Sequence, residues 1–130
     1  MIRAALLVLM GSIPACQADE TVARYGAAGL TWSLASLNGA PFAARATLEF
    51  AVGGPVSGHA ACNRFNTKNT VPYPWFEIGP IAATKMACPD LEAETAYLSA
   101  LAVMTQSEVR GDTLFLRNDA GDEMVFTASE

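Results

Sequence analysis

Positive charge is scarce in this chain. Its 130 residues include 8 Lys and Arg against 13 Asp and Glu, which gives a formal net charge of -5 at pH 7. An acidic surface repels the phosphates of DNA and RNA, and the sequence has no basic stripe with interleaved aromatic residues. The composition therefore disfavours nucleic-acid binding, and we expect no nucleic-acid partner.

The sequence also lacks an apolar run long enough to cross a membrane as a helix. Such a helix needs about 20 apolar residues, and the amino-terminal run stops after residues 4–10. This run follows a positive start at Arg3 and is broken by Gly11, Ser12 and Pro14. The pattern is typical of a secretory signal peptide, which we predict over residues 1–15.

The end of this leader resembles a bacterial lipobox, with the order Ile-Pro-Ala-Cys at residues 13–16. We therefore predict lipidation of Cys16, with residues 16–29 as a polar, small-residue tether to the folded domain. Gln17 after the cysteine, in place of aspartate, favours the outer membrane over the inner one. The alternative is cleavage after Ala18, which would release a soluble periplasmic protein.

Cysteine is scarce as well, and its number is odd. If lipidation consumes Cys16, then Cys62 and Cys88 remain as a pair, 26 positions apart. An exported chain meets an oxidising compartment, so we predict a disulfide between them. Closing that loop would stabilise the fold by about 3–4 kcal/mol. Two free buried thiols are the main alternative.

The spacing of the cysteines and the single histidine disfavours a reactive thiol and a metal site. His59 stands three residues before Cys62, and on a strand that odd spacing directs the two side chains to opposite faces. Two cysteines and one histidine without a C-x-x-C spacing are a poor zinc set. We expect no metal and no other cofactor.

Alternation of apolar and polar residues predicts a sheet. Strand patterns occupy residues 32–37, 46–52, 56–67, 75–78, 81–86, 108–110, 113–117 and 124–128. In the second of these, one face would carry Ala46, Leu48, Phe50 and Val52. Tight turns between the strands make the predicted sheet antiparallel and partly barrel-like.

One helix is predicted between the two groups of strands. Pro89 suits its first position, and Asp90 and Glu92 place negative charge at the positive end of the helix dipole. Its apolar stripe would consist of Leu91, Thr95, Leu98, Leu101 and Ala102. A sheet covered by one helix is an α+β domain, which we place over residues 30–130.

Four motifs stand in order along this domain. They are Trp-Ser-Leu at 32–34, Gly-His-Ala-Ala-Cys-Asn-Arg-Phe at 58–65, Thr-Lys-Met-Ala-Cys at 84–88 and Gly-Asp-Thr-Leu at 111–114. Together they resemble the META/HslJ family, over residues 30–128. One departure is Ala61, where the family often has glycine. The resemblance implies a small envelope protein or lipoprotein, linked in some members to stress, with an antiparallel sheet, one helix and no attached enzymatic activity.

The polar residues in these motifs are interpreted as structural. Asn63 and Thr84 are expected to hydrogen-bond the backbone beside the cysteine pair, as buried polar groups must. The alternative is that they line a ligand pocket. Met86 is predicted to fill the core.

An aromatic contact patch is predicted at Tyr73, Trp75 and Phe76, because flanking prolines place them near a loop. The leading hypothesis is a monomeric, non-enzymatic envelope lipoprotein that binds a partner protein or supports envelope integrity. The alternative is a binding module for a small apolar ligand held between sheet and helix, favoured by the 52% hydrophobic content. A thiol-dependent enzyme is the third hypothesis, and it requires free Cys62 and Cys88.

Overall fold

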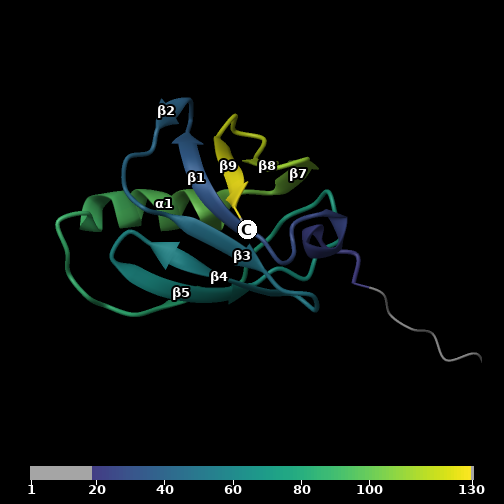
Figure 1. Cartoon of the computed structure of the whole chain (residues 1–130), viewed down its shortest axis with the longest axis horizontal. Helices are drawn as coiled ribbons and strands as arrows, with labels where there is room; N and C mark the ends of the chain where they lie inside the picture. The colour runs from purple at the N-terminus through teal and green to yellow at the C-terminus, as the bar shows by residue number, and fades with distance from the viewer. Residues whose placement is uncertain (1–18, 130) are drawn as a thin grey trace, which may run out of the picture.

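The computed structural model describes residues 19–129, and its dominant feature is one curved sheet of nine strands with a helix on one face (Figure 1). The elements are η1 (Val22–Tyr25), β1 (Thr31–Leu37), β2 (Ala40–Pro41), β3 (Thr47–Phe50), β4 (Pro55–Ala60), β5 (Asn63–Lys68), β6 (Ala82–Ala83), α1 (Leu91–Val103), β7 (Gln106–Arg110), β8 (Thr113–Arg117) and β9 (Glu123–Ser129). The strand order is β6-β5-β4-β3-β1-β9-β8-β7, and β2 pairs with β1. The α+β prediction is confirmed, but the sheet is not closed into a barrel.

Tight turns form the hairpins where their sequences predict them. Asn38 and Gly39 both adopt positive φ, at 50° and 81°, and return the chain from β1 into β2. Strands β7, β8 and β9 form a meander in regular antiparallel register. Strand β1 then joins the two halves of the chain, because it pairs with β3 on one side and with β9 on the other.

The core lies between the sheet and α1, which crosses behind β1 in Figure 1. Tyr97 of α1 is wholly buried and its hydroxyl donates to the Thr47 carbonyl at 2.8 Å. Burial raises the pKa of Tyr97 above its ordinary value. The Tyr97 ring also meets Phe65 and Phe126 edge-on, at centroid distances of 5.9 and 6.4 Å. Each such buried ring stabilises the fold by about 1.5–3 kcal/mol.

The predicted helix is present, and its buried face was predicted in part, because Leu101 is buried and Leu98 packs against the core. The helix begins at Leu91, so Pro89 precedes it. Its buried residues are Glu94, Tyr97 and Leu101, whereas Leu91 of the predicted stripe is 45% exposed. Thr95 and Ala102 of that stripe are also exposed. The tyrosine and the glutamate determine the face because each finds a hydrogen-bond partner inside the fold.

The strand pattern over residues 56–67 is a hairpin in the structure. Its turn is at Ala61, with φ of 60°. This left-handed conformation favours glycine, which explains why a glycine would fit at this position. Since Ala61 carries no such signal, the sequence reads as one continuous strand. Cys62 therefore lies in a turn, where the alternation expected of a strand does not apply.

Other strand predictions were too long. Within residues 81–86 only Ala82 and Ala83 pair with β5, and residues 75–78 contribute only isolated bridges. Val52 was expected beside Phe50, but it lies in the turn after β3 and is 57% exposed. Backbone hydrogen bonds to neighbouring loops replace regular pairing in these segments.

The segment predicted as a tether is folded in its second half. Val22, Ala23 and Ala27 are buried, and the Trp32 indole N–H donates to the Ala27 carbonyl at 2.9 Å. Asp19 fixes the entry of the chain, because its carboxylate accepts hydrogen bonds from the backbone N–H groups of Thr21 and Gly53. Packing thus begins well before Leu30. The predicted signal peptide and Cys16 lie outside the described residues.

Candidate functional site

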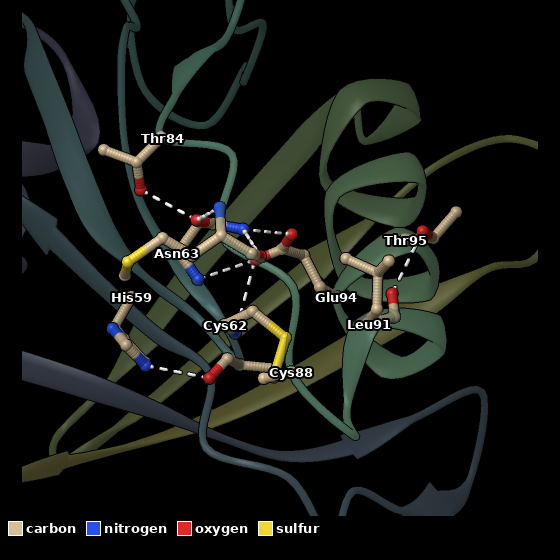
Figure 2. Close-up of a disulfide and its surroundings, with 10 residues drawn as sticks. His59, Cys62, Asn63, Thr84, Cys88, Leu91, Glu94 and Thr95 are labelled. Atoms are coloured by element: carbon tan, nitrogen blue, oxygen red, sulfur yellow. Dashed lines mark hydrogen bonds between the residues drawn. A yellow bond between two sulfur atoms is a disulfide. The ribbon is translucent and has the colours of Figure 1, made fainter.

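The cysteines of the motifs at 58–65 and 84–88 are joined to each other. Cys62 and Cys88 form a disulfide with a Cα–Cα distance of 5.6 Å (Figure 2), within the usual range for such bonds. The bond ties the turn between β4 and β5 to the segment that leads into α1. The predicted pairing is confirmed, so neither sulfur is a resting nucleophile.

Asn63 is the centre of a hydrogen-bond cluster beside this disulfide (Figure 2). Its Oδ1 accepts from Met86 N at 2.6 Å and from Thr84 Oγ1 at 2.9 Å. Its Nδ2 donates to Met86 O at 3.0 Å and to Glu94 Oε2 at 2.8 Å. The amide thus has both donors and both acceptor positions occupied. A fully satisfied group of this kind holds backbone in place and leaves no atom free to bind a ligand.

Glu94 is the member of the cluster that the sequence did not reveal. It is 7% exposed, and its Oε1 accepts from the backbone N–H of Asn63 at 2.8 Å and of Cys62 at 3.3 Å. Its position could have been inferred from its helical spacing to Tyr97 and Leu101, three and seven residues later. The carboxylate thus accepts the N–H of Asn63 and is a second acceptor for the N–H of Cys62, which also donates to Ala60 O at 2.6 Å.

The motif residues therefore divide between buried and exposed positions. Asn63 is buried and hydrogen-bonds the backbone of Met86, as predicted. Thr84 is exposed instead, and its hydroxyl donates to the side chain of Asn63 rather than to backbone. Met86 was predicted to lie in the core, but its side chain is 63% exposed and only its backbone engages Asn63. His59 donates from Nε2 to the Ala61 carbonyl at 3.0 Å. Within residues 19–129, no group of three or more His, Cys, Asp or Glu is placed to hold a metal ion.

The predicted aromatic patch is only partly a surface feature. Phe76 is 1% exposed and packs edge-on against Phe50 in the core. Tyr73 stacks on Tyr25 at 4.7 Å between centroids, and its hydroxyl accepts from Val109 N. Trp75, by contrast, is 56% exposed. The three aromatics thus do not form one exposed patch, and Trp75 alone presents its ring to solvent.

Trp75 forms one wall of an open apolar groove. One side of the groove consists of residues of the loop 71–77, and the other of residues 102–105 at the end of α1. The groove has a volume of about 630 Å³, in the range typical of ligand pockets. Val103, on the helix side, is 52% exposed.

Backbone hydrogen bonds hold the groove in its shape. Phe76 N donates to Thr105 O at 2.9 Å, and Ser107 N donates to Pro74 O at 2.7 Å. Tyr73 N donates to Glu20 O at 2.7 Å, so the chain enters the fold beside the same loop. The bond between Tyr73 and Pro74 is a cis peptide. The loop wall is therefore fixed to β7 and to the amino-terminal segment, and it is joined to the helix wall at Thr105.

A ligand between sheet and helix, the position expected from the sequence, has no room. Tyr97, Leu101 and Phe65 fill that space and are at most 1% exposed. The groove lies instead at the carboxyl end of α1, outside the core.

None of the helices formed by the described residues is long and apolar enough to span a bilayer.

The sequence matches the META domain family over residues 27–130. The chain belongs to the META domain family. The match covers all the elements from β1 to β9, including the disulfide cluster and both walls of the groove. No curated protein matches the chain.

Three solved structures resemble this META domain. An NMR structure of a protein from Burkholderia xenovorans is 25% identical, with a TM-score of 0.65, over 94% of this chain and 97% of that one. A second NMR structure is 20% identical, with a TM-score of 0.60, over 75% and 87%. A DUF4847 family protein from Bacteroides vulgatus is 13% identical, with a TM-score of 0.67, over 82% and 96%. The last two likenesses concern the fold alone.

Proposed function

We propose that this META domain is a non-catalytic binding domain of the bacterial cell envelope, and that its groove takes a segment of a partner protein. The observation that carries the proposal is the groove around Trp75, which leaves a large aromatic ring 56% exposed on a preformed apolar surface. Exposed tryptophans in such settings are frequent anchors of protein interfaces. A role in envelope stress remains a prediction from the family resemblance.

The position of the groove suits an anchored protein. Glu20 O accepts from Tyr73 N, so the chain enters the fold beside the groove loop. Cys16 precedes Glu20 by four residues, which span at most about 14 Å when extended. Lipidation of Cys16 would therefore keep the groove close to the membrane surface, where an envelope partner is accessible.

The proposal is tested by fluorescence anisotropy with a dansyl-labelled, uncharged peptide of alternating Leu and Ser. Wild type should bind this peptide, and Trp75→Ala should bind it about tenfold more weakly, as for an interface anchor. Val52→Ala is the matched control, since Val52 is 57% exposed but lies in the turn after β3. Equal affinity of all three proteins, or no binding to wild type, would contradict the proposal.

A small apolar ligand is the second candidate for the same groove, because about 630 Å³ would hold one. Native mass spectrometry of protein purified from its own host distinguishes the two candidates. A retained adduct that is lost in Trp75→Ala would favour the small ligand. A bare protein mass would leave the peptide segment as the occupant.

A thiol-dependent enzyme is disfavoured by the disulfide, which leaves neither Cys62 nor Cys88 as a thiolate.

A further inference from the structure

Within the proposed binding function, we infer that the groove selects a basic apolar segment, in which Lys or Arg alternates with aliphatic or aromatic residues. Glu77 is the one ionisable residue among those that line the groove. Its side chain is exposed, while its backbone N–H is held by Asn69 Oδ1 at 3.3 Å. The groove wall thus presents a negative charge on a fixed backbone beside an apolar surface.

The end of α1 adds negative potential from the other wall. The carboxyl end of a helix carries about half a negative elementary charge, and α1 has no basic residue in its last turn to offset it. Val103 O is capped only by the neutral amide of Asn118, at 3.2 Å. A cation bound between the helix end and Glu77 would therefore interact favourably with both walls.

Two basic residues lie near the groove in the backbone pairing. Lys68, whose carbonyl accepts from Gly79 N, is exposed and forms no ion pair among the described residues. The other, Arg117, is already engaged. Thr105, a lining residue, donates its N–H to Arg117 O. The Arg117 guanidinium is bonded to Glu108 at 2.9 Å and to Glu123 at 2.7 Å, and it lies 4.6 Å from the Phe115 ring centroid. Arg117 is thus not available to neutralise Glu77.

Trp75 can bind both parts of such a segment. Its exposed ring offers a face to an ammonium or guanidinium group, and the aliphatic stem of Lys or Arg can lie along the apolar wall. An acidic segment would meet Glu77 and the helix end with like charge. The net charge of -5 also favours approach of a cationic partner at low salt.

The test uses three tryptophan-free, eight-residue peptides, in which Leu alternates with Lys, with Glu or with Ser. Binding is followed by the emission of Trp75, because Trp32 is wholly buried and contributes a constant background. At low salt the Lys peptide should bind at least about tenfold more tightly than the Glu peptide. The difference should shrink in 0.5 M NaCl, where charges are screened beyond a few ångströms.

Two charge-neutralising variants locate the selectivity. Glu77→Gln should reduce the ratio of Lys-peptide to Glu-peptide affinity at least about threefold, while Glu92→Gln should leave it unchanged. Glu92 is also exposed but lies in the first turn of α1, at the opposite end of the helix. An equal effect of both variants would show attraction to the whole acidic protein and would overturn the inference.

The remaining outcomes separate this inference from the proposed function. Equal affinity for all three peptides would overturn the basic selectivity while groove binding stands. No binding of any peptide would overturn both. A shift of Trp75 emission with phosphatidylcholine vesicles, without any shift with the peptides, would make the surface a membrane contact and also overturn the inference.

Discussion

Glu94 on α1 and Asn63 at the start of β5 are joined by two hydrogen bonds, one to the side chain and one to the backbone of Asn63. Asn63 Nδ2 donates to Glu94 Oε2, and Asn63 N donates to Glu94 Oε1, both at 2.8 Å. This pair connects the helix to the turn between β4 and β5 independently of the disulfide. It therefore gives the cluster in Figure 2 two separate supports, one covalent and one polar.

Removal of the Glu94 carboxylate should destabilise the protein strongly. Glu94→Ala leaves the backbone N–H of Asn63 without its acceptor and removes one acceptor of the Asn63 amide, and we expect a loss of about 3 kcal/mol in the free energy of unfolding. Glu94→Gln keeps one acceptor oxygen and should cost less. Urea unfolding measures both, with Glu92→Gln as the exposed control. Equal losses for Glu94→Ala and Glu92→Gln would contradict this role.

The disulfide should be complete in the oxidised protein. Alkylation followed by intact-mass measurement should label Cys62 and Cys88 only after reduction. The double variant Cys62→Ser, Cys88→Ser should lose about 3–4 kcal/mol of stability, as closure of a loop of this size predicts. Labelling of both thiols without reductant would reopen the case for cysteine chemistry.

Gly58 should tolerate no side chain. A Cβ at this position would collide with the Thr47 carbonyl and lie 2.9 Å from the Phe65 ring. Gly58→Ala should therefore cost about 3 kcal/mol, at the upper end for overpacking. Gly79→Ala is the matched control, because its Cβ would meet nothing within 4 Å, and it should change stability by less than about 0.5 kcal/mol. Thermal unfolding of both variants measures these losses. If Gly58→Ala is as stable as Gly79→Ala, the prediction that position 58 has no room for a Cβ is wrong.

The carboxylate of Asp19 should make the free energy of unfolding decrease at acidic pH. Hydrogen bonds from Thr21, and then from the Gly53 backbone, hold the pKa of Asp19 below its ordinary value. The folded state therefore binds this proton less readily than the unfolded state, whose carboxyl titrates near about 3.9. The contribution of Asp19 to the free energy of unfolding is therefore present above the unfolded pKa, and it is lost as pH falls through the lower pKa of the folded state. The urea midpoint of wild type should exceed that of Asp19→Asn at pH 6, and the two midpoints should converge as pH falls below the lowered pKa of folded Asp19. A constant difference across this range would contradict the assignment.

Local signals predicted the helix and the hairpins other than the one at Ala61, because those elements depend on neighbours in sequence. The pair Asn38-Gly39 supplies two positive φ angles, and alternation in β8 and β9 matches their burial. The cysteine count predicted the disulfide because an odd thiol is unfavourable outside the cytoplasm. In each case the deciding interaction is short-range or is a matter of composition.

The rest depends on contacts between distant residues. The helical spacing of Glu94 allows a buried position, but the sequence does not reveal its hydrogen-bond partners, which are 31 and 32 positions away. The amino-terminal segment reads as a tether because Val22 and Ala27 are small, yet Trp32 and the strands make a pocket for them. Similarly, nothing local shows that Phe76 turns inward while Trp75, one residue earlier, stays exposed.

The most direct test of the central claim, that the groove at Trp75 is the binding surface, is site-specific photocrosslinking in isolated native membranes. Benzoylphenylalanine replaces Trp75 in one protein and Val52 in the other, since these side chains are 56% and 57% exposed. We predict a discrete adduct from position 75 that excess Leu-Lys peptide suppresses, and none from position 52. Equal adducts from both positions, or none from position 75, would contradict the account.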